Sequence, residues 1–335
     1  ITHNEERFPK KIRAGKAGKQ KVRFQYFEDC YKENAFLAED IRQTVQNGVP
    51  LSEIAVLFRT NMQPRALMEY MVSANLAFQT KDRIPDIYEH WIARDFFTYI
   101  RIAQGSDSRA DFLSIMNRPK RYIGRDSLPD ETVCFDEWMK LYEEQPWIAE
   151  RIEKLWYDLK HLSRLSPYAA INYIRRGIGY DDYLAEYAEY RNANKEDFYE
   201  VADEILASAK GYRTFEEWFA HIEEYRQELK RLAQEKRRNQ NAVTFATLHS
   251  AKGLEFTKVY LIDVNEGVMP YKKAVLKQDV EEERRLFYVG MTRAKESLTI
   301  CSVKKMRGKE VELSRFIKEA GKEPQKTCIG YSMQV

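Results

Sequence analysis

Two short segments of this 335-residue chain combine residue types that could handle a nucleotide. The first, Thr247–Phe256, reads Thr-Leu-His-Ser-Ala-Lys-Gly-Leu-Glu-Phe, and the second, Glu281–Ala294, ends in Val-Gly-Met-Thr-Arg-Ala. A polar turn with a glycine, then a buried strand, then a charged helix ending in Thr-Arg would present hydrogen-bond donors and positive charge to a phosphate. The combination predicts a nucleotide site at the edge of an α/β domain.

Three residues of these segments are candidates for contacting the nucleotide itself. Arg293 is the strongest, because a guanidinium stays charged and its planar fork matches phosphate oxygens bidentately. Gly253 would let the backbone approach a ligand closely, and the Glu255 carboxylate could accept hydrogen bonds from ribose hydroxyls. Their occurrence together predicts a nucleotide-binding surface.

The residues before this glycine suit contacts to nucleic acid. Thr247, His249 and Ser250 lie at the junction of a predicted strand and its loop. Small hydroxyls and an imidazole can form hydrogen bonds with the phosphates of single-stranded DNA. A lone histidine is more often structural or simply exposed, but the surrounding decapeptide favours a functional interpretation.

A fourth candidate for contacting the nucleotide lies far upstream. Arg59 follows Ile54–Phe58, a short apolar run that predicts a buried parallel strand. Ligands gather at the carboxyl ends of strands in open α/β sheets, so Arg59 is well placed to meet an anion. An ordinary surface arginine is the alternative, and it is disfavoured only because the downstream segments are present.

The elements that must position these residues form an α/β pattern with a long helical interruption. From about Trp91 to Gln240 strand signals disappear and helical periodicity takes over. Strands are predicted over Lys21–Phe27, Glu53–Arg59, Val243–Leu248, Lys258–Ile262 and Ser297–Cys301, and helices over Tyr31–Gln46 and Pro64–Ala74. The alternation on either side of the interruption predicts a doubly wound sheet.

Three of these segments resemble sequence motifs of superfamily I DNA helicases of the UvrD, Rep and PcrA type. Ala55–Arg65 resembles motif IV, Thr247–Phe256 motif V and Glu281–Ala294 motif VI. The resemblance implies that Arg59 reaches the γ-phosphate of ATP across a domain cleft and that Arg293 is an arginine finger. It also implies that Glu255 contacts the nucleotide sugar and that the hydroxyls and histidine of motif V contact single-stranded DNA.

The same resemblance implies a fold and a division of the chain. The fold would be a RecA-like parallel-sheet domain, the second lobe of a P-loop NTPase motor, interrupted by a mostly α-helical insertion. Residues 1–145 would hold the first part of RecA-like domain 2A with motif IV. Residues 146–240 would form the helical insertion domain 2B, and residues 241–335 the second part of domain 2A.

The helical part offers a weaker indication of DNA contact. Asn117–Leu128 resembles the segment in which relatives carry Arg-Gly-Ile-Gly, and here Tyr122 replaces the first of the two glycines. A glycine turn at a helix start can present backbone N–H groups to phosphate. Arg121 and Gly124 are therefore predicted to contact DNA.

Several parts of a complete motor are not found in the sequence. Gly15–Gln20 is too short for a Walker A loop and has glutamine where a Mg²⁺-binding hydroxyl belongs. Val259–Asp263 has the form of a Walker B strand but lacks the paired glutamate, and it predicts a core strand instead. In the helicase family these groups belong to the first RecA-like lobe, so we expect this chain to be the carboxyl-terminal part of a helicase.

The resemblance also sets the expected ligands and partners. ATP would bind with Mg²⁺, whose ligands would lie on an N-terminal RecA-like lobe outside this chain, and the chain would have no metal site of its own. Partners would be single-stranded and junction DNA and that N-terminal lobe, with no membrane. The chain alone would be monomeric and inactive as an ATPase, whereas its parent would translocate 3′ to 5′.

Composition is compatible with this interpretation without proving it. The net charge is only +3, but basic runs at Arg7–Arg23 and Lys230–Arg238 could neutralise phosphates or could be solvated surface. The four cysteines are far apart and predict reduced thiols in a cytoplasmic protein. No apolar run is long enough for a membrane span.

Two other functions remain open from the sequence. One is a subunit of a RecB-like or AddA-like helicase–nuclease, which would need a nuclease domain as well. The other is a non-catalytic module that binds DNA or docks a partner through a degenerate motor. Retention of Arg59, Glu255 and Arg293 disfavours the degenerate motor, because a module without hydrolysis has no need for all three.

Overall fold

The computed structural model describes residues 3–5, 22–235, 241–320 and 325–326. They form two compact units, one from Ile1–Pro85 together with Gln227–Val335, and one from Asp86–Arg226. The basic runs noted in the sequence fall largely outside the described residues. None of the described helices is long and apolar enough to cross a membrane.

The first unit contains an eight-stranded sheet whose spatial order is β3-β4-β2-β5-β6-β1-β8, with β7 paired to β6. Every pairing along this order is parallel, and only the β6–β7 pair is antiparallel. The strands are β1 (Arg23–Asp29), β2 (Ile54–Phe58), β3 (Phe78–Thr80), β4 (Val243–Thr247), β5 (Phe256–Leu261), β6 (Ala294–Met306), β7 (Lys309–Glu310) and β8 (Gln325–Lys326).

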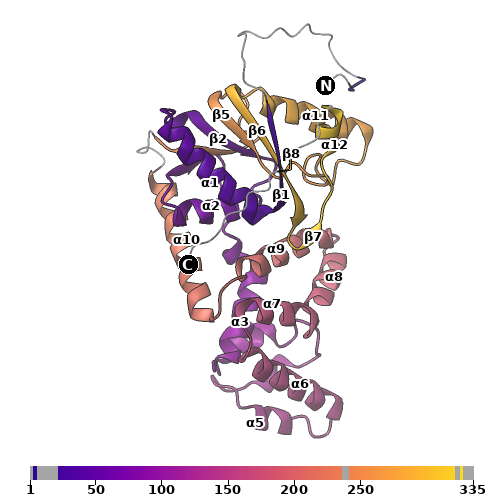
Figure 1. Ribbon diagram of the computed structural model, residues 1–335. Helices are drawn as coiled ribbons and strands as arrows, with labels where there is room; N and C mark the ends of the chain where they lie inside the picture. Colours follow the sequence, from indigo (N-terminus) through magenta and orange to yellow (C-terminus); the bar gives the residue numbers. More distant parts are fainter. Residues whose placement is uncertain (1–2, 6–21, 236–240, 321–324, 327–335) are drawn as a thin grey trace. The chain divides into compact units, whose positions relative to one another are not determined.

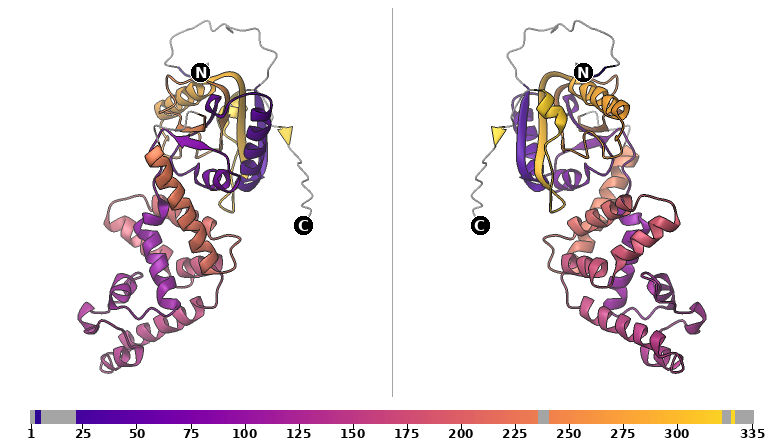
Figure 2. Two further views of the ribbon diagram at one scale, coloured as in Figure 1. Left: turned by 90° about the vertical axis from the view of Figure 1, so that its left-hand side faces the viewer. Right: turned by 90° about the vertical axis from the view of Figure 1, so that its right-hand side faces the viewer.

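Helices cover both faces of this sheet, with α1 and α11 on opposite sides (Figures 1 and 2). Residues of β2 are buried along its whole length, as expected of a parallel strand that is covered on both faces. The helices of this unit are α1 (Cys30–Gln46), α2 (Arg65–Ser73), α11 (Lys277–Met291) and α12 (Arg315–Glu319), with a short 3₁₀ turn at Leu51–Glu53.

The hydrophobic core of the first unit joins α11 to the middle of the sheet. Leu286 and Phe287 pack in one cluster with Leu57 of β2 and Leu261 of β5, and with Leu248, which follows β4. Gly290 lies where α11 passes closest to this cluster, since a Cβ atom there would stand 2.3 Å from Leu248 Cδ2. The helix that ends in Thr-Arg is thereby fixed against the sheet.

The second unit is helical, and all of its residues, 86–226, are described. It contains no β-strand, only an isolated bridge between Ser108 and Thr132. Its helices are α3 (Trp91–Ala103), α4 (Arg109–Ile115), α5 (Phe135–Lys140), α6 (Pro146–Leu162), α7 (Pro167–Arg176), α8 (Tyr180–Tyr190), α9 (Lys195–Ser208) and the first part of α10 (Phe215–Glu235), with 3₁₀ turns at Ile87–Glu89 and Arg125–Ser127.

The α/β sheet interrupted by a helical insertion confirms the fold class that the sequence predicts. All five predicted strands and both predicted helices are present within a few residues of their expected bounds. The three-residue β3 was not predicted, because it is too short to show a pattern and is defined by its long-range pairing with β4. The assignment of residues 1–145, 146–240 and 241–335 to named subdomains stays a prediction, although the two compact units divide after Pro85 and Arg226.

Candidate functional site

The sheet divides the predicted site segments of the first unit between its two edges. Gly253 and Glu255 precede β5 and Arg293 precedes β6, so these three lie at the amino ends of the parallel strands. Phe58 pairs with Thr247 across the β2–β4 ladder, and Leu57 pairs with Leu261 across the β2–β5 ladder. Because these strands are parallel, their carboxyl ends meet at the same edge of the sheet. Arg59, which follows Phe58, therefore lies at the same edge as the loop that follows β4.

Arg59 is held in a bidentate ion pair with Glu283 of α11. Its Nη2 donates to Glu283 Oε1 at 2.8 Å, and its Nε donates to Oε2 at 3.0 Å. The backbone N–H of Tyr271 donates to the same carboxylate at 3.1 Å, and the Tyr271 ring lies 5.1 Å from the guanidinium carbon. The predicted γ-phosphate arginine is thus already occupied by an anionic group of its own unit.

The main chain around Arg59 is fixed by Gln63. Gln63 Oε1 accepts hydrogen bonds from the N–H groups of Arg59 and Thr60, at 2.8 and 2.7 Å. Its Nε2 donates to Asp263 Oδ2 at 3.3 Å. One glutamine therefore ties the turn after β2 to the turn after β5.

Asp263 belongs to a buried acidic pair. Its backbone N–H donates to Glu33 Oε1 at 3.3 Å, and its backbone is in the left-handed region with φ of 52°. Burial, followed by the nearby charge of Asp263, raises the pKa of the Glu33 carboxyl well above its usual range. Two buried carboxyls in contact suit a shared proton, which fits the expectation that Asp263 is a core residue.

Arg293 follows the end of α11 and makes a different set of contacts. Its Nη1 donates to the carbonyl oxygen of Leu254 at 2.9 Å, its Nε to that of Val289 at 3.0 Å, and its Nη2 to Thr292 Oγ1 at 2.9 Å. All three acceptors are neutral, and no ion pair of Arg293 is found among the described residues. The Leu254 contact joins the motif VI and motif V segments.

Gly253 and Glu255 lie on either side of Leu254 in the exposed loop before β5. Gly253 has a φ of +85°, and no atom lies within 4 Å of the place where its Cβ would be. The position needs glycine for its backbone conformation, and the space beside it is open. Glu255 is exposed. Both remain predicted nucleotide contacts.

The predicted DNA contacts of motif V are partly engaged by a carboxylate. The Thr247 backbone N–H donates to Asp82 Oδ2 at 2.8 Å, and the Ser250 hydroxyl donates to Asp82 Oδ1. Ser250 also receives a bond from Thr247 Oγ1 at 3.1 Å, whereas His249 is exposed. These are the donors that a DNA phosphate would use, and Asp82 now occupies two of them.

The prediction for Arg121 in the helical unit needs correction. Arg121 is only 7% exposed, and its Nη1 donates to the carbonyl oxygens of Met116 at 3.0 Å and Ile115 at 3.3 Å. Its Nη2 donates to Tyr99 Oη at 3.2 Å. The guanidinium therefore stabilises the interior of its own loop instead of facing DNA. The sequence did not reveal this because exposed and buried arginines look alike in a loop.

Gly124 is exposed, but its backbone N–H already has a partner. It donates to Tyr142 Oη at 3.2 Å, and a Cβ at this position would lie 3.4 Å from the same oxygen. The 3₁₀ turn that follows it spans only three residues. A phosphate could bind this N–H only by displacing the tyrosine, so the Gly124 contact stays a prediction without support from the geometry.

Glu283 and Asp82 are the site residues that the sequence interpretation missed. Glu283 had a usable signal: residues three, four and seven positions later, Leu286, Phe287 and Gly290, are buried on the same helix face. A carboxylate in such an apolar stripe needs a partner. Asp82 lies in a short loop with no pattern around it, and nothing in the local sequence marks it.

The residues present do not make a magnesium site. Among the described residues, no group of three or more histidine, cysteine, aspartate or glutamate side chains could hold a metal ion. The acidic pair of Glu33 and Asp263 is buried, and the pKa of Glu33 is raised, so it does not suit a hydrated divalent cation.

Comparison with known proteins places these segments in a family. The family model described as the UvrD-like helicase C-terminal domain matches residues 1–133 and 142–305. The chain is 26% identical over 331 residues to the putative ATP-dependent DNA helicase YjcD of Bacillus subtilis, covering 95% of this chain and 43% of that protein.

Two further relatives show the same coverage pattern. The ATP-dependent DNA helicase PcrA of Staphylococcus epidermidis is 29% identical over 351 residues, covering 95% of this chain and 46% of PcrA. The ATP-dependent DNA helicase Rep of Salmonella typhimurium is 27% identical over 303 residues, covering 82% and 44%. The chain spans less than half the length of these relatives.

Proposed function

The chain belongs to the UvrD-like helicase C-terminal domain family, and we propose that it is the carboxyl-terminal part of an ATP-dependent DNA helicase that translocates 3′ to 5′. In this proposal ATP binds between this RecA-like lobe and an N-terminal one, which provides the phosphate loop and the Mg²⁺ ligands. The cytoplasmic location expected from the cysteines is part of the same proposal. Names of relatives such as PcrA and Rep support the class of activity.

The observation that carries the proposal is the state of Arg293. Its guanidinium bonds only neutral oxygens, so its positive charge is not cancelled by a carboxylate of the described chain. It lies at the carboxyl end of α11, where the helix dipole favours a cation, and it is tied to the loop that carries Gly253. An arginine held this way is ready to stabilise the charge on a transferring phosphoryl group.

Arg59, at the opposite edge of the sheet from Arg293, is also proposed to meet the nucleotide, and it would first have to leave Glu283. The guanidinium can exchange one bidentate anion for another, since carboxylate and phosphate oxygens present similar geometry. Closure of the cleft on ATP would supply that phosphate. Thr247, His249 and Ser250 would hold single-stranded DNA on the same lobe, so that opening and closing of the cleft moves the strand.

The test uses the parent protein, with both lobes in one chain, and the 335-residue chain as its comparison. We expect DNA-stimulated ATP hydrolysis by the parent and negligible hydrolysis by the chain alone. Arg293→Ala in the parent should lower kcat by about 10³-fold or more with ATP binding largely kept. Arg293→Lys should recover little, because it restores charge without the planar fork.

Two results would contradict the proposal. Hydrolysis by the isolated chain at the rate of the parent would mean that the phosphate cradle lies within these residues. Near-normal turnover of the Arg293→Ala parent would remove the arginine-finger role and favour a non-catalytic module.

A further inference from the structure

The helical unit carries a second surface with features of a nucleic-acid site. Two large aromatic side chains stand exposed beside each other, Tyr122 with 57% of its surface accessible and Trp147 with 49%. Their ring centroids are 6.5 Å apart with an interplanar angle of 67°. Paired exposed aromatics are uncommon on a domain surface, because burying them would be favourable.

Positive charge surrounds these two rings. The guanidinium carbon of Arg151 lies 5.2 Å from the Tyr122 centroid and 4.9 Å from the Trp147 centroid, and Lys120 Nζ lies 4.8 Å from Tyr122. Lys120 and Arg151 also line a pocket of about 200 Å³ together with Lys154. The rings therefore adjoin a small cationic pocket.

The charges of this pocket are not cancelled by neighbouring acids. Lys120, Arg151 and Lys154 form no ion pair with any described residue. The buried Arg121 guanidinium beneath the pocket also bonds only neutral oxygens. Asp158 is the carboxylate among the lining residues, and its Oδ1 accepts a hydrogen bond from Tyr173 Oη at 2.7 Å. The lining of the pocket therefore contains four cationic side chains and one carboxylate, which favours an anionic ligand.

The acidic and basic side chains of α6 next to this pocket lie on different sides of the helix. Arg151 and Lys154 face the cationic pocket, whereas Glu150 and Glu153 line a different groove next to α5. The side of α6 that adjoins Tyr122 and Trp147 is consequently the basic one.

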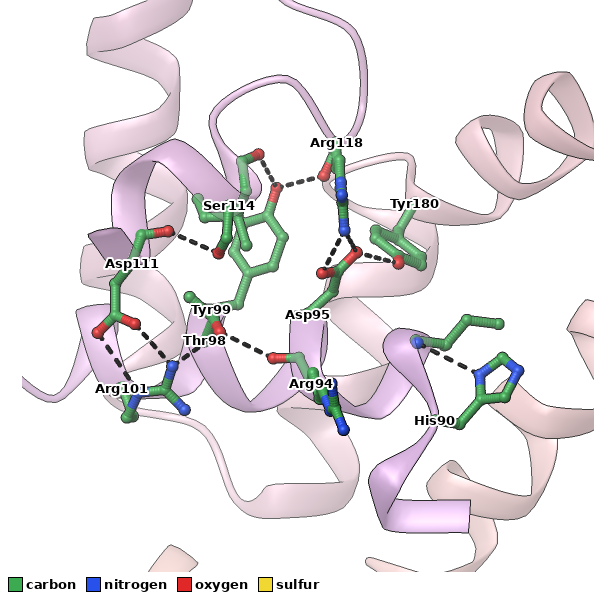
Figure 3. A network of polar contacts seen from close by, with 12 residues as sticks. His90, Arg94, Asp95, Thr98, Tyr99, Arg101, Asp111, Ser114, Arg118 and Tyr180 are labelled. Atoms are coloured by element: carbon green, nitrogen blue, oxygen red, sulfur yellow. Dashed lines mark hydrogen bonds and ion pairs between the residues drawn. The ribbon is translucent and has the colours of Figure 1, made fainter. Parts of the chain in front are cut away.

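Arg118, in the same loop as Tyr122, is held by hydrogen bonds to residues of α3 (Figure 3). The Asp95 carboxylate receives two bonds from Arg118 Nη1, at 2.7 and 2.9 Å, and a third from Tyr180 Oη at 2.6 Å. Tyr99 Oη donates to the Arg118 carbonyl oxygen at 2.7 Å. Such support orders the site before a ligand binds, which lowers the entropic cost of binding.

Tyr122 occupies a backbone conformation that would suit glycine better. Its φ is 57°, in the left-handed region, which costs a bulky residue roughly 1 kcal/mol. Glycine would adopt this conformation without that cost. Strained residues of this kind cluster at ligand sites. At this position the strained conformation is accompanied by an exposed aromatic ring.

We propose that this surface binds one unpaired nucleotide of a DNA strand, with its phosphate in the pocket of Lys120, Arg151 and Lys154 and its base stacked on Tyr122 or Trp147. Base stacking on aromatic side chains beside cationic grooves is the general mode of single-strand binding. A paired base within a duplex has its faces covered by its neighbours, so the exposed rings favour an unpaired base. The choice of DNA as the strand rests on the proposed function.

The test measures binding of the 335-residue chain to a deoxythymidine oligonucleotide of about 10 nucleotides and to a blunt duplex. Tyr122→Gly and Trp147→Ala should each weaken single-strand binding by about tenfold. Tyr122→Gly should not lower the unfolding free energy, because glycine relieves the left-handed backbone. Trp147→Phe should retain most of the affinity, because it keeps a ring.

Matched controls separate this surface from general charge and aromatic content. Tyr157→Ala removes an exposed ring from α6, the helix that carries Trp147. Lys140→Ala removes a cation from the groove that Glu150 and Glu153 line. Neither variant should change the affinity. Lys154→Ala should weaken binding and reduce the slope of log affinity against log salt by about 1. An oligonucleotide with 2-aminopurine should lose fluorescence on binding the native chain and regain it with Trp147→Ala.

Three outcomes would overturn the inference. Unchanged single-strand affinity in Tyr122→Gly and Trp147→Ala would exclude this surface, and if Thr247→Ala still weakened binding the proposed function would stand. Equal losses for the oligonucleotide and the blunt duplex would indicate a backbone contact with paired DNA. Failure of the native chain to bind either DNA, with binding to anionic lipid vesicles instead, would exclude both this inference and the DNA-binding part of the proposed function.

Discussion

Arg59 and Glu283 are 224 positions apart in the sequence and meet in a bidentate ion pair at the carboxyl edge of the sheet. Glu283 also accepts the backbone N–H of Tyr271, whose ring covers the guanidinium. Arg59 is proposed to meet ATP, but in this structure it is bound to Glu283. ATP would have to replace that carboxylate. The strength of the ion pair therefore contributes to the free energy of nucleotide binding.

We expect Glu283→Gln to raise the affinity of the parent protein for ATP by up to about tenfold. Charge-assisted hydrogen bonds contribute roughly 1.5–3 kcal/mol, and the variant weakens bonds that binding has to break. Equilibrium titration with a fluorescent ATP analogue would measure the change. Thermal unfolding of the same variant should show a modest loss of stability, because Arg59 no longer has an anionic partner.

Glu282→Gln is the matched control for this variant. Glu282 is the neighbouring residue on α11, and its exposed carboxylate pairs with Arg285 instead of Arg59. It should leave ATP affinity unchanged. A loss of ATP affinity in Glu283→Gln as large as that in Arg59→Ala would show the opposite role, with Glu283 holding Arg59 in its productive position.

We expect Asp82→Asn to tighten binding of single-stranded DNA to the chain several-fold at low salt. The Asp82 carboxylate occupies the Thr247 N–H and the Ser250 hydroxyl, and it also repels phosphate. Asparagine keeps an acceptor oxygen and removes the charge. The gain should shrink with added salt, because exposed charges are screened over about 10 Å at 0.1 M.

Fluorescence anisotropy with a labelled oligonucleotide at two salt concentrations would measure this gain. Glu310→Gln, an exposed carboxylate on β7, is the control for net charge and should have little effect. Weaker DNA binding by Asp82→Asn would mean that the carboxylate shapes the loop for DNA instead of competing with it.

The contrast between Arg59 and its partner shows what the sequence could predict. The apolar run before Arg59 has the length and residue types of a buried strand, so its place at the sheet edge could be inferred locally. Glu283 and Asp82 reach their partners over 224 and 165 positions. Such contacts depend on the pairing of strands that lie far apart in the sequence, and no local pattern encodes them.

Arg121 shows a second limit of local inference. Its neighbours suggested an exposed loop, and the loop is indeed at the surface, but the guanidinium turns inward to three carbonyl oxygens. The side chains that do face outward are those of Lys120 and Tyr122. Which of three successive loop residues points into a unit depends on packing against α3 and α6, which only the structure reveals.

The buried pair of Glu33 and Asp263 predicts a pH dependence of stability. Burial and the Asp263 charge raise the folded-state pKa of Glu33 above its unfolded value. Its contribution to stability is therefore complete below the unfolded pKa and is lost as pH rises through the folded pKa. Between the unfolded and the folded pKa the loss should approach about 1.4 kcal/mol per pH unit for the one proton involved, and above the folded pKa it should not grow further.

Glu33→Gln should remove this loss, because glutamine resembles the protonated form at every pH. Urea unfolding of the chain from about pH 5 to about pH 9 would measure it. Glu39→Gln, on the same helix and more exposed, should keep the native pH profile. A native profile in Glu33→Gln would show that another group is responsible for the dependence.

The close packing of Gly290 against the sheet leads to a prediction about the position of Arg293. A Cβ at residue 290 would lie 2.3 Å from Leu248 Cδ2 and 3.3 Å from Leu261 Cδ2, so either the buried Leu248 side chain or α11 itself would have to shift. Overpacking of this kind costs about 1–3 kcal/mol. We expect Gly290→Ala to lower the unfolding free energy of the chain by that amount and to lower kcat of the parent, because Arg293 follows three residues later.

Leu248→Ala provides the test of cause. Alone it should destabilise the chain, because it leaves a cavity in the core. Combined with Gly290→Ala it makes room for the added methyl group, so the double variant should be more stable than the sum of the two single effects predicts. A double-mutant cycle by urea unfolding measures this coupling. Strict additivity would mean that the methyl group is accommodated elsewhere and that contact with Leu248 does not fix the distance between α11 and the sheet.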